Sequence, residues 1–154
     1  MIINRKLNVS DEELFDYIVK LFRQEIKKQG FGDVRIQDFY KGLVLKKSIQ
    51  NQEENRSYSF TIAEYDRPKR IKIIYTTSKG TRFVDYRIRH KKDFVCDVEY
   101  EEDIVAKNLR MRLKAMNNDA KTRKNMAKSI KAIEQDIISK RQPDHPMETN
   151  LFSE

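Results

Sequence analysis

A basic run, Arg67-Pro68-Lys69-Arg70, lies between two stretches in which apolar and polar residues alternate. Three cations so close together could bind a phosphate group. Proline presets φ for a turn and donates no backbone hydrogen bond, so the same residues also suit a hairpin turn between two strands. Basic side chains at turns usually face solvent. We therefore expect Pro68 to lie in a structural turn, with phosphate binding as the alternative.

Polar groups also fall on strand faces that are otherwise apolar. Alternation points four tyrosines inward: Tyr58, Tyr75, Tyr86 and Tyr100. Their hydroxyls could orient a mostly apolar ligand, or the rings could be ordinary core. Arg5, Lys47 and Glu64 share faces with apolar neighbours, and a charge in such a place must be paired, reach solvent or meet a ligand. Snorkelling at the sheet edges and polar anchoring of a ligand in a cavity both remain open.

Residue types that support catalysis or metal binding occur without the spacing that this chemistry requires. His90 and His145 have no cysteine or carboxylate at ligand spacing. Cys96 lies on a predicted inward face, where it is more typical of a small core residue than of a nucleophile. The acidic residues at 99–103 fit a solvated strand end. We find no catalytic constellation, expect no metal or cofactor, and favour a protein that is not an enzyme.

Composition and charge narrow the class of protein. A chain of 154 residues with one cysteine predicts a single domain without an internal disulfide, in a reducing compartment. The N-terminus lacks the apolar region of a secretory signal, and no apolar run approaches a membrane span, so we expect a cytoplasmic protein. The net charge of +8 is concentrated in residues 107–141, which hold 11 basic and 3 acidic side chains. That segment could bind an anionic partner.

The elements that must position these residues follow from hydrophobic periodicity. Ser10 and Glu13 form the pattern of a capping box and predict a helix over residues 10–29. Alternation predicts one strand before this helix and a five-stranded antiparallel meander between residues 43 and 101. Residues 34–42 could form a short second helix that ends at Gly42.

A long helix over 107–140 is predicted to cover the apolar face of the sheet. Its expected apolar stripe consists of Leu109, Leu113, Met116, Ala120, Ala127, Ile130 and Ile137, helped by Met126 and Ile133. Arg123 and Lys124 interrupt this stripe, and a bend is expected near Asn117. The chain after 141 is expected to be a tail, which divides the sequence into a domain at 1–141 and a tail at 142–154.

Two stretches, LNVSDEELFDYI and AEYDRPKRIKIIYTTSKGTRFVDYRI, carry a resemblance to a known superfamily. Together with the order of elements, they resemble the helix-grip fold of the START-like (SRPBCC) superfamily, which includes polyketide cyclases and the birch-pollen allergen family. Within it, the chain looks most similar to a bacterial domain of unknown function. The resemblance implies an α+β fold, in which an antiparallel sheet of about six strands wraps a long C-terminal helix.

The resemblance also raises the prospect of a cavity between the sheet and this helix. Our leading hypothesis is a module that binds a small, largely apolar molecule, with Arg5, the four inward tyrosines and Arg123 as candidate ligand-binding residues. Arg123 would lie at the mouth and meet an acidic group of the ligand.

The alternative is an interaction protein whose basic segment 107–141 binds nucleic acid or an acidic protein. An enzyme of the cyclase or hydratase kind rests on analogy alone. The sequence does not indicate an oligomeric state.

Overall fold

The computed structural model describes residues 1–50, 55–110, 112–113 and 119–141. The described chain forms β1 (Ile2–Leu7), α1 (Asp11–Lys28), the 3-10 turn η1 (Ile36–Asp38), β2 (Val44–Gln50), β3 (Asn55–Asp66), β4 (Arg70–Thr77), β5 (Gly80–Lys92), β6 (Val95–Ala106) and α3 (Asp119–Arg141). The short helix expected before Gly42 is reduced to η1. The N-terminal strand and the five-stranded meander are confirmed.

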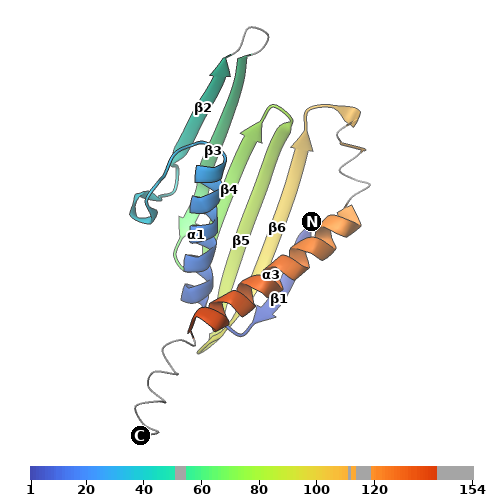
Figure 1. Ribbon diagram of the computed structural model, residues 1–154. Coiled ribbons are helices and arrows are strands. Elements are labelled where there is room, and N and C mark those ends of the chain that lie inside the picture. The colour runs from blue at the N-terminus through green and yellow to red at the C-terminus, as the bar shows by residue number, and fades with distance from the viewer. Residues whose placement is uncertain (51–54, 111, 114–118, 142–154) are drawn as a thin grey trace, which may run out of the picture.

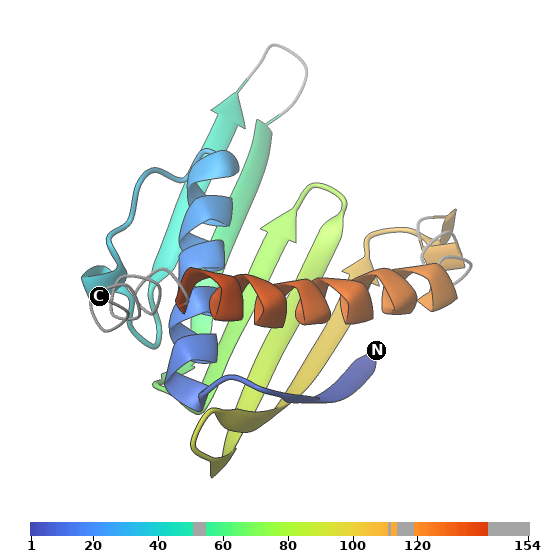
Figure 2. The same cartoon turned by 60° about the horizontal axis from the view of Figure 1, so that its bottom comes forward.

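The strands form one antiparallel sheet in the order β1-β6-β5-β4-β3-β2. Both helices cover the same face of this sheet. In Figure 1, α1 follows the direction of the strands, whereas Figure 2 shows α3 crossing them. Each strand therefore has an inner face toward the helices and an outer face that they leave uncovered.

Helix α1 begins as its sequence predicts. The Glu13 amide donates to Ser10 Oγ at 3.0 Å, and the Ser10 amide donates to Glu13 Oε1 at 3.0 Å, which completes the capping box. Val9 and Leu14 on either side of the cap are buried. The apolar side of α1 then packs into the main core with the inner face of the sheet.

Contacts between side chains join α1 to the end of α3. Tyr17 donates its hydroxyl hydrogen bond to Asp136, and the Arg141 guanidinium binds both carboxylate oxygens of Glu13 at 2.9 Å. The hydrogen bond to Asp136 raises the pKa of Tyr17 to about 12. These links hold the C-terminal half of α3 against α1 and leave the space between the helices wider toward the start of α3.

The predicted stripe on the last helix is only half right. Ile130, Ile133 and Ile137 are buried, but Leu109 and Leu113 are 70% and 53% exposed. Ala120 is exposed as well, whereas Met116 and the expected bend at Asn117 lie outside the described residues. Strand β6 extends to Ala106, so Leu109 and Leu113 follow closely after the end of this strand, where they stay exposed.

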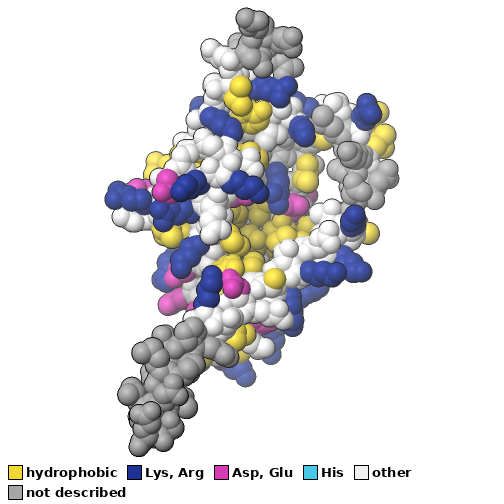
Figure 3. All heavy atoms as spheres, in the orientation of Figure 1, with side chains coloured by type: hydrophobic (Ala, Val, Ile, Leu, Met, Phe, Trp, Pro, Cys, Tyr) yellow, Lys and Arg dark blue, Asp and Glu magenta, His cyan; other side chains and the backbone are white. Residues whose placement is uncertain are grey.

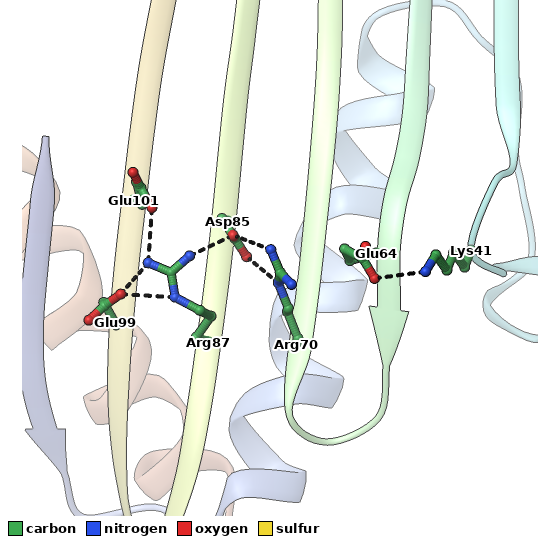
Figure 4. Close-up of polar contacts among 7 residues, drawn as sticks. All are labelled: Lys41, Glu64, Arg70, Asp85, Arg87, Glu99 and Glu101. Carbon is green, nitrogen blue, oxygen red and sulfur yellow. Dashed lines mark hydrogen bonds and ion pairs between the residues drawn. The ribbon is translucent and has the colours of Figure 1, made fainter.

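Glu64 does not share the inner face with Phe60 and Ile62, as alternation predicted. The register between β3 and β4 shifts between Ile62 and Glu64, so that Glu64 pairs with Lys72 on the outer face. A β-bulge adds one residue to a strand and reverses the faces of those that follow it. Glu64 forms an ion pair with Lys41 at 3.3 Å on that face (Figure 4).

Candidate functional site

A pocket of about 340 Å³ lies between the inner face of the sheet, α1 and α3. Figure 3 shows a hollow between the two helices with hydrophobic side chains at its bottom and charged side chains at its rim. Its lining comes from Phe22, Glu25, Gln29, Phe60, Ile73, Tyr75, Thr77, Lys79, Gly80, Thr81, Arg82, Val84, Tyr86, Tyr100, Ile104 and Met126. Residues from α1, β3, β4, β5, β6 and α3 therefore meet at one place.

The strand register arranges the inner-face residues of the pocket in rows across the sheet. Next to the β4–β5 turn, Thr77 pairs with Gly80, and in the row one step further in, Tyr75 pairs with Arg82, which in turn pairs with Ile104. The next row contains Ile73, Val84 and Glu102. The row after it contains Tyr86 and Tyr100, whose ring centroids lie 5.0 Å apart. Polar groups thus gather toward the turn, and the apolar rows lie deeper under the helices.

The aromatic side chains form the apolar part of the pocket. The ring of Phe22 on α1 meets Phe60 and Tyr86 with centroid distances of 6.4 and 6.0 Å. Met126 on α3 lines the pocket from the opposite helix. A concave, mostly apolar space with a few polar groups at one end is the usual form of a small-molecule site.

On the β5–β6 side, Arg82, Glu102 and Tyr100 form a hydrogen-bonded group. Glu102 Oε2 accepts from Arg82 Nε at 2.7 Å and from the Tyr100 hydroxyl at 2.7 Å. The Glu102 side chain is only 7% exposed, whereas that of Arg82 is 48% exposed. A buried carboxylate is costly unless it is paired, so the arginine and the phenol stabilise Glu102 where it lies. The hydrogen bonds from Arg82 to Glu102 in turn hold the Arg82 guanidinium in place at the pocket.

On the β4 side, Tyr75 donates to Gln29 Oε1 at 3.2 Å, and Gln29 Nε2 donates to Glu25 Oε1 at 2.8 Å. This chain connects the rim of the pocket to the end of α1. Lys47 donates to the backbone oxygen of Gln29, and its ammonium lies over the rings of Phe31 and Tyr58. The inward charge of Lys47 is therefore paired with polar and aromatic groups.

The tyrosines of the pocket stay protonated at neutral pH. Burial raises the pKa of Tyr86 and of Tyr100, and at Tyr100 the hydrogen bond to Glu102 adds to the rise. Burial, followed by the negative charge of Glu25, also raises the pKa of Tyr75. Neutral phenols can donate or accept a hydrogen bond, but they do not supply a phenolate base.

The structure brings three of the six predicted site residues together: Tyr75, Tyr86 and Tyr100 line the pocket. Tyr58 lies outside that lining, against Lys47. Arg5 is exposed on the edge strand β1, and Arg123 is exposed on α3. Neither arginine is part of the pocket lining.

Four residues that matter for the polar end of the pocket were not predicted: Arg82, Glu102, Lys79 and Gln29. The signal for Arg82 was available, because it continues the alternation of Val84 and Tyr86 toward the turn. Glu102 likewise continues the face of Val98 and Tyr100. The sequence offered no comparable signal for Gln29, which reaches the pocket only because α1 ends beside Tyr75.

The basic run at residues 67–70 forms a structural turn between β3 and β4, as predicted. Arg67 binds Asp16 of α1 through two hydrogen bonds of 2.9 Å, and Arg70 binds Asp85 on the neighbouring strand. The peptide bond between Arg67 and Pro68 is cis. Two of the three cations are thus paired with carboxylates of the same chain.

The outer face of the sheet carries a network of ion pairs (Figure 4). Arg87 contacts Asp85, Glu99 and Glu101, while Asp85 also accepts from Arg70. Arg89 pairs with Asp97. The outward arginines of β5 thus pair with acids of the neighbouring strand β6, as cross-strand pairing favours.

Comparison with known proteins gives a family and a fold. A family model described as a domain of unknown function, DUF3284, matches residues 1–120. The chain belongs to the DUF3284 family. No curated protein matches the sequence of this DUF3284 chain. Among the described residues, no group of three or more metal-ligating side chains could hold a metal ion, and no helix is both long and apolar enough to cross a bilayer.

Solved structures with the same architecture align with most of this DUF3284 chain. Ara h 8.0201 aligns at 11% identity and a TM-score of 0.54, covering 90% of this chain and 97% of its own. A point mutant of norcoclaurine synthase from Thalictrum flavum, in complex with a transition-state analogue, aligns at 9% identity and a TM-score of 0.55, with 92% and 94% covered. The Mll3558 protein from Rhizobium loti aligns at 12% identity and a TM-score of 0.54, with 86% and 94% covered. These matches show the START-like helix-grip fold.

Proposed function

We propose that this protein binds a small, largely apolar molecule in the pocket between the sheet, α1 and α3, without covalent chemistry. The observation that carries the proposal is the pocket of about 340 Å³, whose deeper lining is apolar and aromatic. Burial of apolar ligand surface against such a lining is favourable by about 25 cal/mol per Å². The polar groups at its turn end would orient the ligand rather than supply most of the affinity.

The hydrogen bonds within the pocket support binding over catalysis. Glu102 is engaged by Arg82 and Tyr100, and Glu25 is engaged by Gln29. The pocket tyrosines are held in the neutral form. A general base needs a free, suitably placed lone pair within reach of the substrate, and Glu102, buried and held by Arg82 and Tyr100, is poorly placed for that role.

The experiment is a fluorescence titration with N-phenyl-1-naphthylamine, a neutral hydrophobic probe. Met126 lines the pocket from α3 and is half-buried, so Met126→Trp should fill the space without disturbing the sheet, and Met126→Leu is the size-matched control. We expect saturable binding to the wild type and to Met126→Leu, and its loss in Met126→Trp. Circular dichroism checks that the variants fold. Absence of saturable binding to the wild type, or equal binding by Met126→Trp, would refute the proposal.

A second candidate function follows from a groove between β1 and α3. Its lining contains Arg5, Lys6, Lys124, Lys128 and Lys131, against a single acid, Glu134. Glu134 Oε2 accepts from the Asn8 amide and Glu134 Oε1 lies 3.7 Å from Lys131, so the excess charge of the groove is positive. We propose this groove as the place where an anionic partner would bind.

Binding to this groove would be driven by counterion release and would weaken steeply with salt. A duplex oligonucleotide and polyglutamate serve as probes, with a Lys124→Gln/Lys128→Gln/Lys131→Gln variant for comparison. Salt-sensitive binding that the triple variant loses supports this function. Binding that is unchanged by salt or by the variant argues against it.

A further inference from the structure

The end of the pocket beside the β4–β5 turn, here called its turn end, contains the guanidinium group of Arg82. Only some of the N–H donors of this group have a partner. Arg82 donates to Glu102 Oε2 through Nε and Nη2. Among the described residues, no partner is shown for Arg82 Nη1. The side chain is 48% exposed and lies in the row between Tyr75 and Ile104. A fixed, charged donor therefore faces the pocket with hydrogen atoms to spare.

Lys79 brings a second cation to the same end. It lies in the turn between β4 and β5, where its amide donates to Thr77 Oγ1 at 3.1 Å and its carbonyl accepts from the Lys107 amide at 3.1 Å. Gly80 permits this close approach, because its φ is +148° and an added Cβ would lie 2.3 Å from the Val105 carbonyl oxygen. The ammonium of Lys79 has no ion-pair partner within the part of the chain that the structure describes. The turn is thus anchored by its backbone, while its side chain is left available.

Two carboxylates lie near this end of the pocket, and neither is placed to repel an anion between Arg82 and Lys79. Glu102 accepts from Arg82 and Tyr100. Glu25, the carboxylate in the lining itself, accepts from Gln29 at the end of α1, on the side of Tyr75. A group seated between Arg82 and Lys79 would meet the charge of Lys79 and the remaining N–H donors of Arg82, whose own charge is balanced by Glu102, with the apolar rows of the pocket below it.

We infer that the ligand of this pocket is an amphipathic anion, whose carboxylate or phosphate group binds between Lys79 and Arg82 and whose hydrocarbon body lies against Phe22, Phe60, Ile73, Val84 and Met126. This inference rests on the proposed function and adds the chemical class of the ligand. Arginine and lysine together suit an oxyanion, because charge-assisted hydrogen bonds to a guanidinium are roughly twice as strong as neutral ones. Arg123, which the sequence suggested for this role, is exposed on α3 outside the pocket lining.

The test compares four probes that share one hydrocarbon chain: decanol, decanoate, decyl phosphate and decylamine. Each displaces N-phenyl-1-naphthylamine from the wild type, below its micelle-forming concentration. We expect at least one anion to bind about tenfold or more tightly than decanol, since a hydrogen bond to a charged group adds about 1.5–3 kcal/mol. The stronger of the two anions identifies the headgroup. Decylamine should bind most weakly.

Variants assign the preference to the two cations. Lys79→Gln should reduce the preference for the anion over decanol several-fold, while Lys121→Gln, the same change on the exposed side of α3, should leave it unchanged. Removing Arg82 alone would leave Glu102 buried without its cation, so the double variant Arg82→Gln/Glu102→Gln is used and checked by circular dichroism. In that variant the preference should fall about tenfold or more, with decanol affinity nearly unchanged.

The outcomes separate the inference from the proposed function. If decanol and the anions bind equally, or if decylamine binds most tightly, the inference is wrong while apolar binding stands. An anion preference that survives both the Lys79 variant and the double variant also contradicts it. If none of the probes displaces N-phenyl-1-naphthylamine, or the dye itself does not bind, the proposed function fails and the inference fails with it.

Discussion

Asp85 is buried on the outer face of the sheet between two arginines. Arg70 donates to both of its carboxylate oxygens, at 3.2 and 2.9 Å, and Arg87 donates to Oδ2 at 2.7 Å. The Asp85 side chain is 6% exposed, whereas the partners of the Arg67–Asp16 pair are about half exposed. Arg67 and Arg70 are only three residues apart in sequence, but the carboxylate that each of them binds differs strongly in burial.

We expect Arg70→Gln to lower the free energy of unfolding by about 1–3 kcal/mol, because it leaves a buried carboxylate with fewer donors. Arg67→Gln should lower it by less than about 1 kcal/mol, as is usual for an exposed ion pair. Urea denaturation of both variants measures the difference. Equal effects of the two changes would show that Asp85 does not depend on Arg70.

Cys96 should be unreactive in the folded protein. Burial raises the pKa of its thiol to about 12. Nearby carboxylates add to the rise, and Asp11 contributes most among them. The thiolate is the reactive form, so at pH 8 its fraction should be about a thousandfold lower than for an ordinary thiol. Because this pKa is raised, reactivity should increase only as the pH climbs toward 12. We expect labelling by iodoacetamide at pH 8 to require denaturant, and rapid labelling of the native protein would contradict the burial.

At the scale of residues, alternation in the sequence was reliable where the strands are regular. It placed Tyr75, Tyr86 and Tyr100 on the inner face, and the same rule applied one step further would have included Arg82. It was wrong for Glu64, because the β-bulge beyond Ile62 leaves no mark in the pattern of apolar residues. Whether a tyrosine lines a pocket or packs in the core depends on neighbours distant in sequence, which periodicity does not specify.

Among the elements, α1 is the one whose start the sequence predicts most completely. Ser10→Ala removes the hydrogen bond from the Glu13 amide and should cost about 1 kcal/mol of unfolding free energy. Ser129→Ala is the control, because Ser129 Oγ donates to the Asn125 carbonyl on the exposed side of α3 and caps no helix end. Thermal denaturation compares the two. The cap would be unimportant if Ser10→Ala melted at the temperature of the wild type.

The apolar residues before and within α3 should differ sharply in their contributions. Ile130 is 2% exposed, so Ile130→Ala should cost about 2–5 kcal/mol. Leu113→Ala should change the free energy of unfolding by no more than about 0.5 kcal/mol, since Leu113 is 53% exposed. Chemical denaturation of both variants gives the two values. A cost for Leu113→Ala close to that for Ile130→Ala would mean that the predicted longer stripe is buried after all.

Helical periodicity could predict that residues near 130 form an amphipathic helix, but not where burial begins. Leu109 and Leu113 fit the same spacing as Ile130 and Ile137. What separates them is the length of β6, which continues to Ala106. The contact between α3 and the sheet is thus set by a neighbouring element, and a pattern read along one helix does not contain that information.

At the scale of the whole molecule, the START-like helix-grip fold was predictable because each element carries its own signal. Capping box, alternation and turn residues agree on one order of elements, and that order allows few arrangements. For the pocket, the resemblance predicted only a cavity between the sheet and the last helix, without its exact position. Its position beside the β4–β5 turn depends on how α1 and α3 diverge, which the links between Tyr17 and Asp136 and between Arg141 and Glu13 determine at one end.

Charge is distributed unevenly over the molecule, and this distribution follows only in part from the order of charged residues along the chain. On the outer face of the sheet, arginines and acids pair with one another, so this face offers little net charge to a partner. A further group of cations, Arg5, Lys6, Lys124 and Lys128, lies in the groove between β1 and α3, and Lys79 lies at the turn end of the pocket. The net charge of +8 therefore does not mark the whole surface as a binding site for anions.

The central claim, that an apolar molecule binds in the pocket between the sheet and the two helices, is tested most directly by methyl NMR during titration with decanol. The account predicts saturable shifts for the methyl groups of Ile73, Val84, Ile104 and Met126, together with intermolecular contacts from these groups to the ligand. The methyl groups of Val44 and Ile49, exposed on the edge strand β2, should not move. Shifts confined to residues outside the pocket, or no saturable shifts at all, would contradict it.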